Sequence, residues 1–206
     1  RETGQSWELM ASRGCCGKCS FCYKFMGAGM SMRNVDDVLD EIQYIIDKHN
    51  ISSFYFVDEN FLQVDRYFNE FIEKKNQRGL DFKFIIQARI DAITRKKCEI
   101  GSQNGLICIS TGVESVSQRT LNKINKGISV QDSENKIALL REYGIKPAVN
   151  FIIGFPWETE EDYQELVEFL ERNSLQKHAK LAYLAPLPST PIFTEAVEKG
   201  YIKNEF

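Results

Sequence analysis

The segment that best indicates the fold of this chain is a cysteine-rich loop, which reads Ser12-Arg13-Gly14-Cys15-Cys16-Gly17-Lys18-Cys19-Ser20-Phe21-Cys22-Tyr23. Four of the six cysteines lie between Cys15 and Cys22, a distribution typical of a metal site rather than of scattered disulfides. Thiolates select zinc, copper(I) or iron–sulfur clusters. A zinc site normally needs a second pair of ligands a dozen or more residues away. No such pair exists here, because Cys98, Cys108, His49 and His178 stand alone in the sequence.

The spacing Cys-x3-Cys-x2-Cys at Cys15, Cys19 and Cys22 offers three thiolates from one compact loop. A four-iron cluster that only carries electrons takes four cysteines, so three ligands leave one iron open, as a catalytic metal requires. Cys16 interrupts this spacing and is left out of the predicted ligand set. The alternative interpretation is a surface loop with redox-active thiols or adventitious zinc.

Short apolar runs continue along the chain on both sides of this loop. They are rich in Ile, Val, Phe and Tyr, and several are continuous rather than alternating, which is typical of strands in a helix-covered parallel sheet. We predict strands at residues 7–12, 53–57, 82–88, 106–111, 147–153 and 181–185. Three helices are predicted to begin after the capping residues Asn34, Ser129 and Thr159, and a fourth to end near Gly79. A fifth helix, between Asp91 and Gln103, is predicted mainly from the regular alternation of strands and helices.

Six βα units fit into 206 residues, because one unit takes roughly 30 residues. A closed eight-fold barrel would need about 250 residues. The pattern therefore predicts one α/β domain and leaves two architectures open, a six-stranded βα arc or a doubly wound sheet.

Polar residues follow several predicted strands. In βα barrels the active-site residues lie at the carboxyl ends of the strands, so we expect this set to face the cysteine loop across one rim. The set is Asp58, Glu59, Asn60, Gln87, Arg89, Glu114, Asn150 and Gly154. Other interpretations stay open: Asp58 to Asn60 as a turn and helix cap, Arg89 with Asp91 as a surface ion pair, and Glu114 as a residue favouring a helix N-terminus.

With these companions, the cysteine loop resembles the radical S-adenosylmethionine (SAM) superfamily. The triple-cysteine spacing, with Phe21 before the last cysteine, is its main signature. Further segments match in order, at residues 56–61, 87–91, 112–115, 124–127 and 151–159. Together they resemble the branch of cobalamin-dependent methyltransferases, anaerobic ring-forming cyclases and methylthiotransferases.

This resemblance implies a partial (β/α)6 barrel, similar to a TIM barrel, with a parallel sheet and outer helices. It implies that Cys15, Cys19 and Cys22 hold a [4Fe–4S] cluster whose fourth iron binds SAM. The implied SAM contacts are Phe21 beside the adenine, Asp58, Glu59 and Asn60 near the amino group, Gln87 beside them, Arg89 at the carboxylate, Glu114 at the ribose, and Asn150 to Gly154 along the adenine. A reduced flavodoxin or ferredoxin would supply electrons.

The resemblance also implies reductive cleavage of SAM to a 5′-deoxyadenosyl radical that acts on a small-molecule or peptide substrate, with cobalamin carried on a domain outside this chain. We expect residues 1–206 to be the radical SAM core of a longer cytoplasmic protein. Composition fits an ordinary globular domain, with 43% hydrophobic residues, and the net charge of −3 disfavours nucleic-acid binding. No apolar stretch is long enough for a membrane helix. Two alternatives are a methylthiotransferase-like enzyme and a non-enzymatic iron–sulfur electron-transfer or zinc-binding module.

Overall fold

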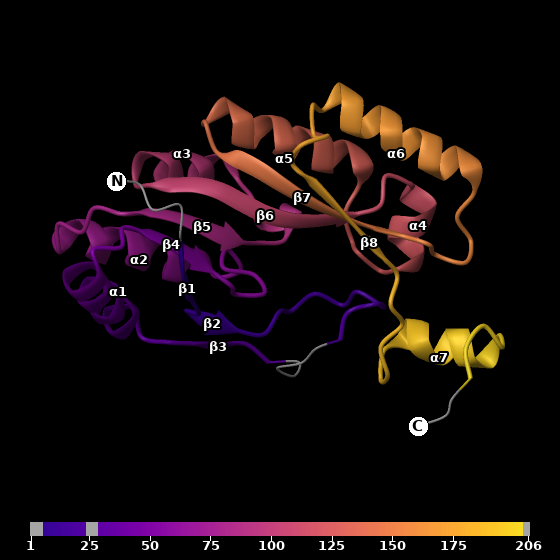
Figure 1. Ribbon diagram of the computed structural model, residues 1–206, viewed down its shortest axis with the longest axis horizontal. Helices are drawn as coiled ribbons and strands as arrows, with labels where there is room; N and C mark the ends of the chain where they lie inside the picture. Colours follow the sequence, from indigo (N-terminus) through magenta and orange to yellow (C-terminus); the bar gives the residue numbers. More distant parts are fainter. Residues whose placement is uncertain (1–5, 24–28, 204–206) are drawn as a thin grey trace.

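The computed structural model describes residues 6–23 and 29–203, which form a parallel six-stranded sheet covered by helices (Figure 1). The strands of the sheet are β1 (Trp7–Leu9), β4 (Ser53–Phe56), β5 (Lys83–Gln87), β6 (Leu106–Glu114), β7 (Lys146–Ile153) and β8 (Ala179–Tyr183). The helices are α1 (Val35–His49), α2 (Asp65–Gln77), α3 (Arg95–Gln103), α4 (Gln118–Lys123), α5 (Val130–Glu142), α6 (Glu160–Arg172) and α7 (Pro191–Glu198), with a 3-10 turn η1 (Ile90–Ala92).

The strands lie in chain order, β1-β4-β5-β6-β7-β8, and every neighbouring pair is parallel. A doubly wound sheet reverses its strand order at a switch point, so this order excludes that architecture. Within the described residues, β1 and β8 are the two edges of the sheet and do not pair with each other. The α/β prediction is confirmed as an open six-stranded arc, in which the carboxyl ends of the strands meet along one rim.

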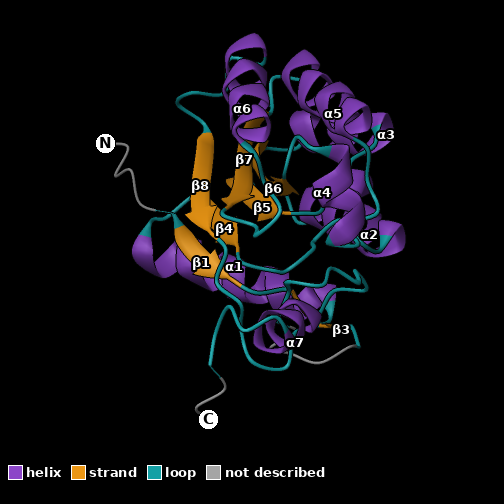
Figure 2. Cartoon of the chain, turned by 90° about the vertical axis from the view of Figure 1, so that its right-hand side faces the viewer, coloured by secondary structure: helices purple, strands orange, loops and turns teal. Residues whose placement is uncertain are grey.

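The outer face of the sheet carries the hydrophobic core. On β7, Val149 and Phe151 are buried, and Phe151 packs edge-on against Phe169 of α6 with ring centroids 5.9 Å apart. Figure 2 shows α5 and α6 on this side of the sheet. Because side chains alternate along a strand, Asn150 lies on the opposite, inner face. This alternation separates a packed outer layer from an inner face that is free to bind a ligand.

Aromatic rings form the part of the core under α2. Phe71 packs against the rings of Phe56, Phe82 and Phe84 at centroid distances of 5.5, 6.4 and 5.7 Å. Edge-to-face pairs of this kind each add about 0.5–1.5 kcal/mol beyond area burial. The aromatic residues on this face of α2 are therefore part of the hydrophobic core.

The helix starts follow the predicted capping residues. Asn34 accepts a hydrogen bond from the Asp36 N–H at 2.8 Å, and Ser129 accepts one from the Asp132 N–H at 3.0 Å. Thr159 forms a capping box at the start of α6. Each cap satisfies a backbone donor that the first helical turn leaves free.

Several predicted element boundaries were wrong. The strand predicted at residues 106–111 continues to Glu114, and the strand predicted at residues 181–185 is Ala179–Tyr183. The first strand, predicted for residues 7–12, ends at Leu9, because the chain turns away and Ser12–Arg13 forms β2, which pairs antiparallel with β3 (Ser31–Met32). The helix predicted between Asp91 and Gln103 divides into η1 and α3, because Thr94 caps a new helix by accepting from the Lys97 N–H. The short helices α4 and α7 were not predicted.

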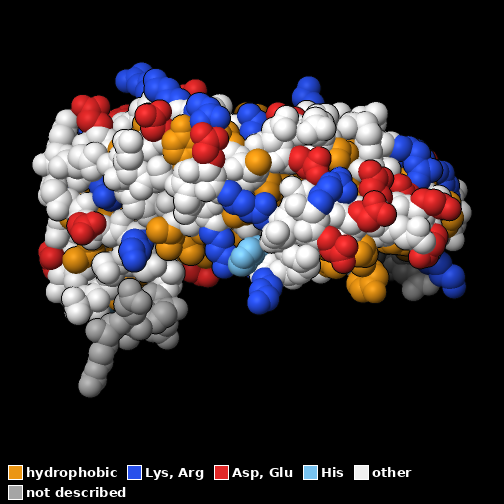
Figure 3. Space-filling model, turned by 90° about the horizontal axis from the view of Figure 1, so that it is seen from above, with side chains coloured by type: hydrophobic (Ala, Val, Ile, Leu, Met, Phe, Trp, Pro, Cys, Tyr) orange, Lys and Arg blue, Asp and Glu red, His pale blue; other side chains and the backbone are white. Residues whose placement is uncertain are grey.

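No helix in the described part of the chain is both long and apolar enough to cross a membrane. Acidic and basic side chains are interspersed over the face seen in Figure 3. The remaining cysteines, Cys98 and Cys108, are buried free thiols, as expected for small core residues.

Candidate active site

A cavity of about 300 Å³ opens at the carboxyl ends of the strands, beside the cysteine loop. This is within the size range of small-molecule sites. Its lining residues are Cys15, Gly17, Cys19, Phe21, Cys22, Glu59, Gln87, Ala88, Arg89, Ser110, Gly112, Glu114, Lys126 and Asn150. The cavity therefore brings together all of the predicted site residues except Asp58, Asn60 and Gly154.

Backbone contacts hold the cysteine loop against the segment that follows α4. The Ser20 N–H donates to the Ile124 carbonyl at 2.9 Å, and the Asn125 side chain donates to the Lys18 carbonyl at 3.0 Å. Gly14 has a φ of +93°, and a Cβ there would overlap the backbone of Gly29. The loop conformation thus depends on a glycine and on residues about 100 positions along the chain.

Cys15, Cys19 and Cys22 line the cavity together. Desolvation raises the pKa of the Cys22 thiol, and the nearby Cys19, Glu59 and Cys15 raise it further, whereas Lys126 lowers it. These influences reflect the closeness of three sulfurs and one carboxylate at one end of the cavity.

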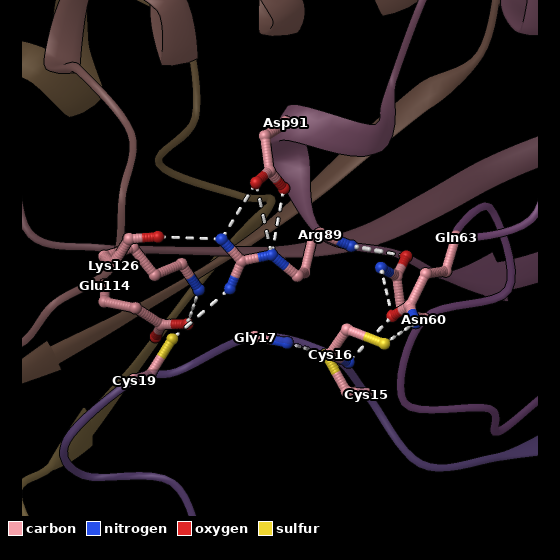
Figure 4. Close-up of polar contacts among 10 residues, drawn as sticks. All are labelled: Cys15, Cys16, Gly17, Cys19, Asn60, Gln63, Arg89, Asp91, Glu114 and Lys126. Carbon is pink, nitrogen blue, oxygen red and sulfur yellow. Dashed lines mark hydrogen bonds and ion pairs between the residues drawn. The ribbon is translucent and has the colours of Figure 1, made fainter. Parts of the chain in front are cut away.

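Cys16 lies outside this group. Gln63 donates its amide N–H to the Cys16 sulfur at 2.8 Å and accepts the Cys16 backbone N–H at 3.1 Å. Figure 4 shows the Cys16 thiol turned toward Gln63, away from Cys19. The loop between β4 and α2 therefore holds Cys16 apart from the other three thiols.

The donor set fits a cluster with three protein thiolates. Within residues 6–23 and 29–203, no three His, Cys, Asp or Glu side chains converge on a single metal ion. A four-iron cluster does not require such convergence, because each thiolate binds its own iron. Gly17 leaves room for the side chains of Arg89 and Cys15, since a Cβ at this position would lie 2.8 Å from Arg89 Nη1 and 3.3 Å from Cys15 Sγ.

A buried ion pair forms the wall facing the cysteines. Lys126 Nζ lies 2.7 Å from Glu114 Oε1, and the two side chains are 5% and 11% exposed. Glu114 has a φ of +71° at a register shift between β6 and β7. Gly112 makes room for its carboxylate, because a Cβ at that position would overlap Glu114 Oε1. The pair thus depends on a strained residue and a neighbouring glycine.

Arg89 lies between this ion pair and the cysteine loop (Figure 4). Its Nε and Nη2 donate to the Asp91 carboxylate, Nη2 also donates to the Lys126 carbonyl at 2.7 Å, and Nη1 donates to Cys19 Sγ at 3.3 Å. Burial alone would lower the pKa of Arg89, but Asp91 and Cys19 raise it on balance. The fork of the guanidinium is engaged by Asp91, so a two-pronged contact with a SAM carboxylate would need a different arrangement.

Three predicted site residues lie outside the cavity. Asp58 is fully buried, and its carboxylate accepts from the Ala11 N–H at 3.1 Å and from the Ser12 hydroxyl at 2.5 Å. The amide oxygen of Asn60 accepts the backbone N–H of Arg89 at 3.1 Å.

Gly154, the third, donates its N–H to Glu158 at 2.7 Å and lies in the turn after β7, with a φ of +87°. In this conformation Asp58 and Asn60 support the loops of the site, and the Gly154 N–H is held by Glu158 in the turn.

The radical SAM superfamily model matches residues 9–170 of this sequence. The chain belongs to the radical SAM superfamily. An anaerobic magnesium-protoporphyrin IX monomethyl ester cyclase of Rubrivivax gelatinosus is 31% identical over 192 residues, covering 91% of this chain and 34% of the relative. An uncharacterized methyltransferase of Pyrococcus horikoshii is 27% identical over 196 residues, covering 94% of this chain and 42% of the relative. The chain spans about a third to two fifths of these relatives.

A solved radical SAM methyltransferase from Kitasatospora setae, with cobalamin and a [4Fe–4S] cluster bound, has the same fold. The TM-score is 0.83 at 18% identity, and the match covers 94% of this chain and 37% of that chain. The predicted TIM-like partial barrel is thereby confirmed. Relatives of this radical SAM domain include methyltransferases, an anaerobic cyclase and methylthiotransferases, so the predicted branch is also confirmed.

The sequence analysis of this radical SAM domain proposed no ligand contact for two charged residues, Lys126 and Asp91, that the structure brings to the site. Lys126 lies in the segment at residues 124–127 that resembles the superfamily. This resemblance was the only sequence feature that could have pointed to Lys126 as a site residue. Asp91 was considered as the partner of Arg89 in a surface ion pair. The structure confirms that pair and shows that Arg89 is largely buried, with its side chain 14% exposed.

Proposed function

We propose that this domain binds a [4Fe–4S] cluster through Cys15, Cys19 and Cys22, and SAM in the adjoining cavity. The observation that carries this proposal is the gathering of three thiols and a buried Glu114–Lys126 pair around one cavity in a member of the superfamily. When bound, the cluster and SAM would supply reductive cleavage of SAM to methionine and a 5′-deoxyadenosyl radical.

The side chains of the cavity would orient SAM. Glu114 accepts hydrogen bonds and suits ribose hydroxyls, and Glu59 suits the SAM ammonium group. Phe21, Gln87 and Asn150 line the same cavity and are proposed to border the adenine and the amino-acid part. Arg89 is proposed to reach the SAM carboxylate through Nη1, whose bond to Cys19 leaves one N–H free among the described contacts.

We propose different roles for the three predicted SAM contacts that lie outside the cavity. Asp58 and Asn60 would act through the loops that they hold, because their polar atoms bond to the protein. Gly154 would border the adenine through its backbone, since it follows β7 directly.

The subclass that we propose is methyl transfer or ring formation, after the names of the methyltransferase and cyclase relatives. We further propose that residues 1–206 are the core of a longer protein in which cobalamin lies on another domain. The substrate would be a small molecule or a peptide, and a reduced flavodoxin or ferredoxin would supply the electron in the cytoplasm.

Anaerobic reconstitution with iron and sulfide, followed by low-temperature EPR of the reduced protein with and without SAM, tests this proposal. We expect a four-iron signal that changes when SAM is added. A protein that binds only zinc, or a cluster indifferent to SAM, would instead support the metal-binding or electron-transfer alternatives.

Cysteine variants test the ligand set. Replacement of Cys15, Cys19 or Cys22 by Ala should abolish the cluster, because each thiolate is the ligand of one iron. Cys16→Ala is the matched control and should retain most of the iron, since Cys16 contacts Gln63 instead. Equal loss of iron from Cys16→Ala would refute the assignment.

A further inference from the structure

Arg89 is fixed beside a single sulfur of the cysteine loop. Asp91 holds one side of the guanidinium, with Nη2 2.9 Å from Oδ2, and the Lys126 carbonyl holds the same nitrogen at 2.7 Å. The remaining nitrogen, Nη1, then lies 3.3 Å from Cys19 Sγ. A cation fixed from two directions and aimed at a third group is pre-organised for that group.

Among the described residues, Arg89 is the only cation with a hydrogen bond to one of the three cavity thiols. Lys126, the other cation lining the cavity, is paired with Glu114 at 2.7 Å. Asp91 pairs with Arg89 from the side away from Cys19, as Figure 4 shows. Glu59 also lines the cavity and adds negative charge near Cys22. The bond from Arg89 to Cys19 is therefore the direct polar link between the charged wall and the proposed cluster.

We propose that Arg89 raises the reduction potential of the cluster through its hydrogen bond to Cys19, and that Asp91 moderates this effect. The inference rests on the proposed function, since it requires the cluster at Cys15, Cys19 and Cys22. Hydrogen bonds to the sulfurs and the local net charge are among the factors that set such potentials. Reduction adds one electron from an external donor and therefore one negative charge. A nearby guanidinium stabilises that charge, and the Asp91 carboxylate opposes it.

Substitutions of the two residues should shift the reduction potential of the cluster in opposite directions. A purely structural disturbance of the loop would not produce opposite shifts. Arg89→Gln removes the cation and leaves Asp91 uncompensated, so both effects lower the potential. Asp91→Asn keeps the guanidinium, which still bonds to the Lys126 carbonyl and Cys19, and removes the opposing charge. The potential of Asp91→Asn should therefore rise.

The experiment is a redox titration with dithionite, followed by EPR, of anaerobically reconstituted protein without SAM. Omitting SAM excludes any contribution from contacts between Arg89 and that ligand. For Arg89→Gln we expect the ratio of reduced to oxidised cluster at a fixed potential to fall about tenfold, which is 59 mV for a one-electron couple. Arg95→Gln is the matched control, because it makes the same charge change in an exposed ion pair between α3 and Glu142 of α5.

An unchanged potential in Arg89→Gln, or a lowered potential in Asp91→Asn, would overturn the inference. If Arg89→Gln does not assemble a cluster, Asp91→Asn decides, and a rise in potential is required. A wild-type protein that fails to assemble a cluster would refute the proposed function itself. If wild type assembles a cluster and both variants have the same reduction potential as wild type, only the inference is refuted.

Discussion

At the scale of single residues, Glu114 shows how backbone strain marks this site. A residue other than glycine with a backbone φ of +71° is uncommon, and this conformation persists only where the surrounding structure holds it. The ion pair with Lys126 and the space left by Gly112 supply those surroundings. Ser110, Gly112 and Glu114 lie on the cavity face of β6 by ordinary alternation, and the register shift before Glu114 breaks the regular pairing with β7 beside the site.

Tyr67 of α2 provides a residue-scale prediction about pH. Its hydroxyl is buried without a hydrogen-bond partner among the described residues, and desolvation with the Asp58 carboxylate raises its pKa to about 12. Between pH 10 and 12 the unfolded chain ionises at this position and the folded chain does not. Wild-type stability should therefore fall relative to Tyr67→Phe by roughly 1.4 kcal/mol per pH unit above pH 10.

Urea denaturation at pH 8 and at pH 11 measures this difference. At pH 8 Tyr67→Phe should be as stable as wild type or slightly more stable, because an unpaired buried hydroxyl is unfavourable. Tyr44→Phe, at an exposed position of α1, controls for the loss of a phenol. A difference between wild type and Tyr67→Phe that does not grow with pH would contradict the burial argument.

At the scale of elements, Lys97 of α3 ties together the loops that follow two neighbouring strands. Its ammonium donates to the carbonyls of Leu62 and Ala92, each at 2.9 Å, and pairs with Asp65 at 2.7 Å. Leu62 follows β4, and Ala92 ends the turn that contains Asp91. The lysine is thus a structural bond between segments that border the site.

Lys97→Met should lower the free energy of unfolding by about 2–3 kcal/mol, because two carbonyls lose their donor and each loss costs at least about 1 kcal/mol. Chemical denaturation measures the change. Lys96→Met, one position earlier and exposed, is the matched control. Equal midpoints for the two variants would show that the loops do not depend on this lysine.

Elements with regular patterns were predictable from the sequence, and elements stabilised by distant contacts were not. The six strands and the capped helices follow from apolar runs and from residues such as Asn34 and Thr159. The short β2–β3 pair depends on bonds to Asp58, 46 residues from Ser12, which no local pattern reveals. Helices of six and eight residues, such as α4 and α7, contain too few turns for a clear period.

The same limit applies to the site. Because the carboxyl ends of parallel strands lie along one rim, the segments that meet at the site could be predicted from the sequence. Most of the expected residues do line one cavity. Which side chain of a strand-end loop points inward depends on the loop conformation. Glu59 therefore lines the cavity while its neighbour Asp58 is buried beneath the loop.

At the scale of the whole molecule, the cysteine loop links segments that are far apart in the sequence. It is bonded to Ile124 after β6 through Ser20, and the Ser20 carbonyl accepts the N–H of Ile192 in α7 at 3.2 Å. Arg89, after β5, adds a bond to Cys19. A ligand that binds beside this loop should therefore restrict the motion of several strand-end segments at once.

Hydrogen–deuterium exchange of the anaerobically reconstituted protein tests this coupling. Because SAM would bind only while these contacts of the cysteine loop are formed, a concentration of about 100 times its Kd should suppress local opening by about 2.7 kcal/mol. Slower exchange is expected at Ser20 and in residues 87–92 and 112–128 together. Helix α1, whose residues do not line the cavity, is the internal reference. Protection confined to the cysteine loop would mean that SAM contacts the loop alone and that the rim does not act as one binding unit.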